Sequence, residues 1–422
     1  MNDAPTSSDE KLGQRPGFQK RLIAALRPAL GTAGVTYLGM AMSFIATPMV
    51  ARELGADGRG VLAAAFVSLQ LVSWLGFLGI PRGIVLQRKS EGFTPTSSIG
   101  IVTLLGLISA VVCFATAGLV ANGDERIEVG IRIASVLLVA IGIGQVGSEY
   151  VLAEGRMRVW NLARLSTVML PAAANIVGFF GGWLTLEYAY LATLAGQVVA
   201  TLVGCILAIP VFKNKRHGKL PWAFSFHYWS ATAFDSLGGR ADQLLLAALA
   251  TPAALGTYAI GITFAAASGA LTQAVNHSSY GRLVAAATAE NGESDASVVR
   301  RDFSKRAWFA FGVSTVVGAA VVLVVEVFGS WLLGPGFEDI GVITMFLVLA
   351  QIVNDQWQLR VYADSATREG RYLTYASASA FVVLVLGVVA LEVLDAFNSV
   401  SMAVLLIFTG AVRLGVRSVL KR

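Results

Sequence analysis

The chain has 422 residues, of which 55% are hydrophobic and 14% are charged, and its formal net charge is +6. A typical soluble domain has about 25% charged residues and lacks apolar runs of about 20 residues. The composition therefore excludes a soluble globular protein and indicates an integral membrane protein. In that setting the positive charge reports orientation against the inner leaflet and does not indicate nucleic-acid binding.

Twelve apolar stretches follow one another along the chain, each long enough to cross a hydrocarbon core about 30 Å thick. Continuous apolarity without period-2 alternation excludes a β-barrel and predicts an all-α fold. The expected spans are residues 28–50, 60–81, 98–121, 131–153, 165–183, 187–209, 229–250, 254–276, 307–333, 340–361, 373–391 and 398–417.

The stretch "ARELGADGRG" separates the first two spans and combines four charged residues with three glycines. We expect a tight external turn in which Gly55, Gly58 and Gly60 permit the reversal of the chain. An ordinary solvated loop is the alternative.

Orientation follows from the distribution of basic residues. Residues 1–27 are polar and basic and contain no signal-peptide pattern, which predicts a cytoplasmic N-terminal tail. If the spans alternate from there, 27 of the 32 Lys and Arg residues face the cytoplasm, as the positive-inside rule requires. Arg also outnumbers Lys, as in GC-rich bacterial genomes. We expect a multi-pass protein of the bacterial inner membrane with both termini in the cytoplasm.

The basic segment 210–228 divides the chain into a first half, residues 28–209, and a second half, residues 229–422, which ends in a short basic cytoplasmic tail. Six spans in each half let both halves enter from the same side, which predicts two parallel-repeat six-helix bundles around a central cavity. "LGADGRGVLAAA" and "LATPAALGTYAIG" align with Gly60 opposite Gly256. The alternative is that any two apolar hairpins look alike.

Signatures of enzymes are missing from the sequence. The three histidines lack metal-ligand spacing, and "GIGQVG" lies within an expected span, where small residues let helices approach closely. We therefore expect no catalytic residues, no cofactor and no metal site.

Charged residues at membrane depth stand out instead. Arg240 lies near the middle of the seventh span, where a lipid-facing charge costs about 2.5 to 3.5 kcal/mol, so it should face an interior or a wet cavity. On a continuous helix Asp235 and Asp242 would share a face and Arg240 would point elsewhere. Arg240 is then available to a fixed partner on another span or to an anionic substrate. Glu149 and Asp355 are further carboxylates within expected spans.

Four stretches in order resemble the polysaccharide-biosynthesis flippases, related to O-antigen flippases, of the multidrug/oligosaccharidyl-lipid/polysaccharide exporter superfamily. They are "ARELGADGRGVLAAA", "LGFLGIPRGIVLQRK", "EGRMRVWNLARL" and "RADQLLLAALATPAALGTYAIG".

The resemblance implies a flippase that moves a polyprenyl-diphosphate-linked oligosaccharide from the cytoplasmic to the external leaflet by alternating access. The diphosphate would be bound at successive positions along its path by three cationic side chains: Arg240, Arg52 and Arg82. Expected partners are this glycan, membrane lipids, H⁺ or Na⁺, and polysaccharide polymerase machinery. The candidate ion-coupling residues are Asp235, Asp242, Glu149 and Asp355.

Three alternatives remain open. A cation- or drug-exporting transporter of the same superfamily would use the acidic residues of the seventh span rather than Arg240. A membrane polymerase or ligase would need a large external loop, and the sequence predicts only short ones. A scaffold without transport activity is the third.

Overall fold

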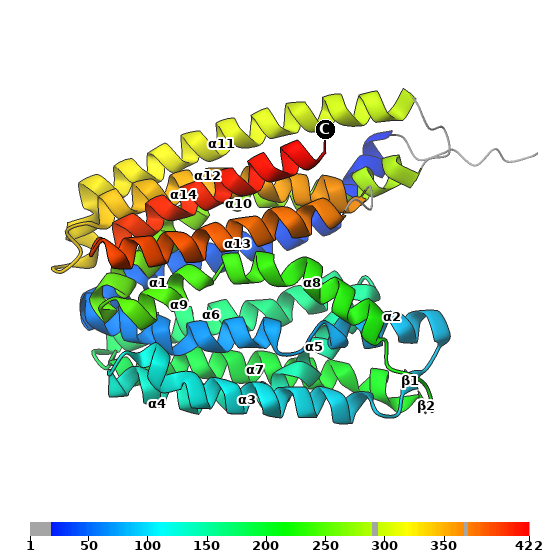
Figure 1. Ribbon diagram of the computed structural model, residues 1–422, viewed down its shortest axis with the longest axis horizontal. Helices are drawn as coiled ribbons and strands as arrows, with labels where there is room; N and C mark the ends of the chain where they lie inside the picture. The colour runs from blue at the N-terminus through cyan, green and yellow to red at the C-terminus, as the bar shows by residue number, and fades with distance from the viewer. Residues whose placement is uncertain (1–17, 289–293, 367–369, 422) are drawn as a thin grey trace, which may run out of the picture.

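The computed structural model describes residues 18–288, 294–366 and 370–421, and nearly all of them are helical (Figure 1). Two short strands, β1 (Thr94–Pro95) and β2 (Lys215–Arg216), lie between helices. The helices are α1 (Phe18–Leu75), α2 (Ile80–Glu91), α3 (Ser98–Ala121), α4 (Glu125–Ser135), α5 (Leu138–Ala153), α6 (Met157–Gly181), α7 (Leu186–Lys213), α8 (Trp222–Gly238), α9 (Ala241–Leu249), α10 (Pro252–Thr288), α11 (Ser294–Leu333), α12 (Ile340–Ala366), α13 (Gly370–Val393) and α14 (Ser399–Leu420).

Within the described residues, nine helices are long and apolar enough to cross a membrane. The number rises to ten when α4 and α5, which bend by 53° at their junction, are taken as one span. The prediction of a multi-pass, all-α membrane protein is confirmed in this form.

Helix α1 reverses direction at the predicted turn. The segment Leu38–Glu91 has 54 residues, which would measure about 80 Å as a straight helix and far exceed a bilayer core. Gly55 interrupts it with φ 67° and ψ −178°, a backbone conformation open mainly to glycine. In Figure 1 the blue ribbon runs to the left edge and returns toward α2. We call this end of the bundle the Gly55 end and the opposite end, at β1 and β2, the β end.

A small clasp at the β end holds the segment between the two halves of the chain. β1 pairs in parallel with β2, with Thr94 opposite Lys215. The Asn214 side chain donates a hydrogen bond to the Gly92 carbonyl at 2.8 Å, and the Gln87 side chain donates one to the Lys219 carbonyl at 3.0 Å. The connecting segment is therefore fastened to the first half of the chain as far as Lys219.

The two halves meet most closely at the Gly55 end, where α1 crosses α10. A Cβ on Gly60 would lie 1.6 Å from the Pro252 carbonyl oxygen, and a Cβ on Gly256 would lie 1.9 Å from the Ala56 carbonyl oxygen. The contact is reciprocal, because each glycine faces the carbonyl four residues before the other glycine. The two glycines aligned in the sequence therefore pack against each other.

The seventh expected span is broken, which corrects one prediction. Helix α8 ends at Gly238 and α9 begins at Ala241, and Arg240 caps α9 with φ −142° and ψ −12°. Two successive glycines weaken the helix at this point. The face that Asp235 and Asp242 would share on a continuous helix does not exist across this break.

Candidate functional site

A cavity of about 410 Å³ surrounds the break between α8 and α9. Its walls come from α8, α9, α10, α12, α13 and α14. On α12 the lining runs from Leu347 to Gln358, roughly 10 to 27 Å along the helix from its start at 1.5 Å per residue. The cavity thus lies at mid-bundle depth as expected, but the second half of the chain encloses it alone.

The cavity wall is polar over much of its surface. It combines three charged side chains with four amides and two hydroxyls: Arg240, Asp242 and Arg413; Gln243, Gln351, Asn354 and Gln358; Ser377 and Thr409.

Arg240 is exposed to this space, because the end of α8 leaves its side chain outside the packed core. Among the described residues, no carboxylate forms an ion pair with Arg240. Asp242 is 3% exposed, and one of its carboxylate oxygens accepts a 2.7 Å hydrogen bond from the Tyr258 hydroxyl. The guanidinium therefore faces the cavity, while the nearby carboxylate is held by α10.

Arg413 is a second cationic residue of the cavity, and it was not among the predicted site residues. It donates a hydrogen bond to Asn354 Oδ1 at 3.0 Å, and its guanidinium lies 4.6 Å from the centre of the Trp357 ring. The available signal was its position inside the apolar stretch 398–417, where a charge needs an interior partner.

Arg82 lies at the β end, where the two halves of the chain touch. It donates a 2.7 Å hydrogen bond to the Tyr228 hydroxyl of α8, and its guanidinium lies 4.5 Å from the centre of that ring. Glu149 is 3.8 Å from Arg82 Nε. Next to this contact, a Cβ on Gly83 would lie 2.1 Å from Ser225 Oγ, so α2 and α8 are closely packed.

Arg52 lies at the Gly55 end. Its guanidinium donates a hydrogen bond to the Trp331 carbonyl at 3.0 Å and lies 5.8 Å from the centre of that ring. The three predicted arginines are therefore spread over the depth of the bundle, with one at each end and Arg240 between them. Arg52 and Arg82 each bridge the two halves of the chain.

The remaining predicted carboxylates, Asp355 and Asp235, belong to α12 and α8. Asp355 is 1% exposed and accepts hydrogen bonds from Ser314 at 2.6 Å and from Gln351 at 2.7 Å. Thr272 of α10 is 2.9 Å from the same serine. Asp235 belongs to α8, and its side chain lies outside the described residues.

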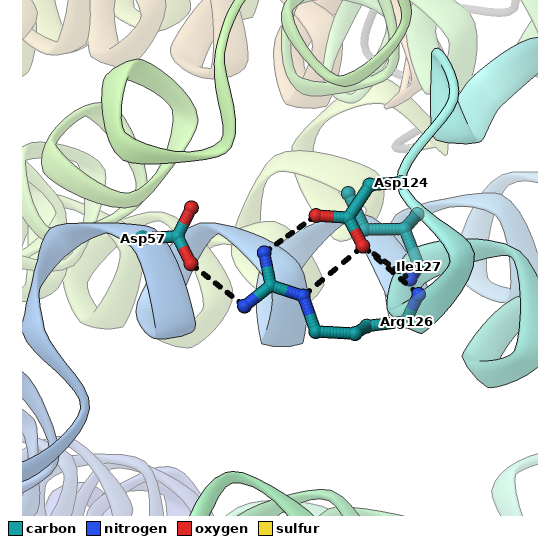
Figure 2. A network of polar contacts seen from close by, with 4 residues as sticks. All are labelled: Asp57, Asp124, Arg126 and Ile127. Carbon is teal, nitrogen blue, oxygen red and sulfur yellow. Dashed lines mark hydrogen bonds and ion pairs between the residues drawn. The ribbon is translucent and has the colours of Figure 1, made fainter.

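An exposed polar network at the Gly55 end joins the turn of α1 to the start of α4 (Figure 2). Arg126 bridges Asp57 at 2.8 Å and Asp124 at 2.6 Å. Asp124 also caps α4 by accepting a hydrogen bond from the Arg126 backbone, and the hydrogen bond from the guanidinium lowers the pKa of its carboxyl. The network stabilises the Gly55 turn from within the first half.

An ion cluster at the β end ties the last helix to α12. Asp364, with a side chain 1% exposed, accepts two 2.6 Å hydrogen bonds from Arg417 and one of 2.8 Å from Lys421. Burial by itself opposes ionisation of this carboxyl, but the hydrogen bonds from the two cations outweigh it and hold its pKa below the ordinary value.

The model of a family described as polysaccharide biosynthesis protein matches residues 26–276, which is more than half of the chain. The chain belongs to this family. No match was found among the curated proteins.

Solved structures with the same fold are transporters and flippases. Lipid II flippase MurJ in an inward closed conformation is 10% identical, with a TM-score of 0.66 over 93% of this chain and 87% of that chain. An inward-facing multidrug resistance MATE family transporter of the MOP superfamily is 13% identical, with a TM-score of 0.63 over 90% of this chain and 96% of that chain. A mutant form of the MATE transporter VcmN of Vibrio cholerae is 15% identical, with a TM-score of 0.57 over 95% of this chain and 97% of that chain.

At these identities the likeness concerns the fold alone. The family match confirms the predicted resemblance to polysaccharide-biosynthesis proteins, and the solved structures named here are described as transporters or as a flippase.

Proposed function

We propose that the protein is a flippase that moves a polyprenyl-diphosphate-linked oligosaccharide from the cytoplasmic to the external leaflet for surface polysaccharide synthesis. The observation that carries the proposal is the exposed Arg240 in a polar cavity at mid-bundle depth. Family membership supports the glycan, and the printed name of the MurJ structure supports a lipid-linked cargo. The product would pass to polysaccharide polymerase machinery outside.

The proposal includes twelve spans in two six-helix bundles. The ten candidate spans count the reversed segment of α1 and α2 once, and they omit α8 with α9. Counting both limbs at Gly55 and adding the broken α8 and α9 pair gives twelve. The reciprocal contact of Gly60 and Gly256 supports the parallel repeat, because residues related by a two-fold axis meet one another in pairs.

The same count sets the orientation. An even number of spans returns both chain ends to the β end, which also carries most of the Lys and Arg residues. The positive-inside rule then assigns the β end to the cytoplasm and the Gly55 end to the outside. The tail 1–27 and the segment 210–228 would be cytoplasmic, and the bacterial inner membrane is the matching location.

Mechanism follows from the cost of moving polar groups through hydrocarbon. Each unsatisfied polar group costs several kcal/mol there, so the glycan and the diphosphate need a polar route while the lipid tail stays in the bilayer. Arg240 would hold the diphosphate midway by charge-assisted hydrogen bonds. The Gly60 contact at one end and the Arg82 contact at the other would open in turn, which is alternating access.

Replacement of Arg240 by Gln tests the proposal. We expect loss of export with normal membrane insertion, measured as surface polysaccharide and protein abundance in cells that lack the wild-type gene. Arg132→Gln is the matched control, because Arg132 pairs with Glu128 on its own helix α4. Normal surface polysaccharide at normal abundance of the Arg240 variant would refute the role of this residue.

We also propose coupling of transport to an H⁺ or Na⁺ gradient. Asp235, Asp242, Glu149 and Asp355 are the candidate carriers, and Asp242 is the one that lines the cavity. Transport in vesicles that responds to neither gradient would contradict the coupling and leave the flippase proposal in place.

A cation or drug exporter of the same superfamily is the second candidate function. The carboxylate of Asp242 on the cavity wall and the fold shared with a multidrug resistance transporter favour it. Deletion of the gene would then sensitise cells to cationic dyes and leave the surface glycan intact, whereas the flippase proposal expects the opposite pair of results.

A further inference from the structure

The charges on the cavity wall restrict the kind of ligand that fits inside. Arg240 and Arg413 outnumber the single carboxylate of Asp242 on this wall, so they disfavour a metal ion or an organic cation and leave an anionic group of the ligand to the arginines. The volume of about 410 Å³ is also within the range of pockets for small organic molecules, and an isolated ion needs much less. A polar group of moderate size without positive charge satisfies both restrictions.

The amides of the wall provide donors and acceptors together. Gln351 and Asn354 are engaged with Asp355 and Arg413. Gln243 and Gln358 also line the cavity, and neither forms a side-chain hydrogen bond within the part of the chain that the structure describes. An amide side chain can donate two hydrogen bonds and accept two, and a hydroxyl both donates and accepts. These two glutamines therefore suit a ligand rich in hydroxyl groups.

Two aromatic rings supply an apolar part of the same wall. Phe234 of α8 and Phe381 of α13 line the cavity with their ring centres 6.2 Å apart at an angle of 51°. The face of an aromatic ring is electron-rich and attracts the positively polarised C–H groups of a neighbouring molecule. A sugar ring has such C–H groups on its faces and hydroxyls around its edge.

We propose that this cavity is a binding site for a neutral sugar ring. Gln243 and Gln358 hydrogen-bond its hydroxyls, and Phe234 and Phe381 pack against its apolar face. The inference rests on the proposed flippase function for the origin of the sugar, which is one unit of the lipid-linked glycan. Arg240 stays available to the diphosphate, so sugar and phosphate are recognised by different residues.

The test is saturation-transfer difference NMR on the purified full-length protein in detergent micelles, with glucose, galactose and N-acetylglucosamine as separate probes. The variant Gln243→Met/Gln358→Met keeps the side-chain length and removes the hydrogen bonds. Gln197→Met in α7 of the first half is the matched control. We expect a signal for at least one sugar with the wild type and the control, and a loss of at least fivefold in the double variant.

Two results would overturn the inference. One is the absence of a signal above empty micelles for all three sugars, or an equal signal in the double variant, with melting temperatures showing that each protein is folded. The other is binding of inorganic pyrophosphate or Na⁺ without binding of any sugar.

The two proposals fail in distinguishable ways. If the flippase function is wrong, Arg240→Gln leaves surface polysaccharide unchanged, while the sugar signals still depend on Gln243 and Gln358. If the sugar site is wrong, the signals do not depend on the two glutamines, whatever the effect of Arg240→Gln on export.

Discussion

A single methyl group at Gly60 is expected to open the Gly55 end of the protein. The Cβ of an alanine would lie 1.6 Å from the Pro252 carbonyl oxygen and 3.0 Å from the Gly256 nitrogen, whereas real Cβ contacts below 3.0 Å essentially do not occur. The helices α1 and α10 must therefore separate by roughly 1.5 Å or more. Overpacking of this kind costs about 1 to 3 kcal/mol.

The size of this cost decides the effect on the conformational equilibrium. The contact exists only when the Gly55 end is closed, so the substitution destabilises that state alone. A cost of about 1 to 3 kcal/mol lowers the ratio of closed to open molecules by about 5- to 150-fold. Gly256→Ala perturbs the same contact from the other side, with 1.9 Å to the Ala56 carbonyl oxygen. The double variant should add less than the sum of the two single effects.

The assay is a distance measurement between spin labels at Asn122 and Asn398, which lie in loops of the two halves and line one hollow at the Gly55 end. We expect a longer mean distance in Gly60→Ala than in the wild type. Gly100→Ala is the control, because a Cβ there has no neighbour within 4 Å among the described residues. Identical distance distributions in the Gly60 variant and the wild type would refute the reasoning.

Two predictions concern the β end. Tyr228→Phe removes the hydrogen bond to the partly exposed Arg82 and keeps the ring, so it should weaken the closed state of the β end by about 1 kcal/mol. Maleimide labelling of a Ser225→Cys variant should then be about fivefold faster. An unchanged labelling rate would contradict this. Asp364→Asn removes the negative charge and one of the two oxygens that accept the Arg417 hydrogen bonds. It should lower the stability of the purified protein by about 1 to 3 kcal/mol, measured by thermal unfolding. The pKa of Asp364 is lower in the folded protein than in the unfolded chain. Its stabilising effect is therefore present at pH above about 4 and is lost as the pH falls through the folded pKa. A difference in stability between wild type and variant that grows on acidification would contradict the assignment.

The helices and the first turn could be predicted from the sequence because local signals determine them. Long apolar runs require helices in a membrane, and Gly55 stands among charged residues where a chain can reverse. The match of Gly60 with Gly256 was also visible in the sequence. Their reciprocal packing was not, because it depends on how α1 and α10 cross.

The site was predictable only in part. The cost of a charge at membrane depth singles out Arg240, and the structure brings it to a polar cavity. The role of Arg52 and Arg82 along a route stays a prediction. In the structure they contact Trp331 and Tyr228 across the two halves, which the sequence did not indicate. Such pairings join residues 279 and 146 positions apart, and no local pattern encodes them.

Arg413 is a cavity residue that the sequence did not reveal. It lies close to the end of the expected span 398–417, where an arginine is commonly solvated at the membrane surface. The partners that make it part of the cavity, Asn354 and Trp357, belong to α12, and helix packing alone brings them within reach.

The clasp at β1 and β2 limits how the two halves of the chain can move relative to each other. With the connecting segment fastened as far as Lys219 and α8 starting at Trp222, Leu220 and Pro221 form a short connection between the two halves of the chain. Two residues span at most about 7 Å, so the start of α8 stays near the clasp as long as the clasp is formed. In the alternating access that we propose, the β end would therefore open by tilting of the two halves about this connection and not by their separation at this point.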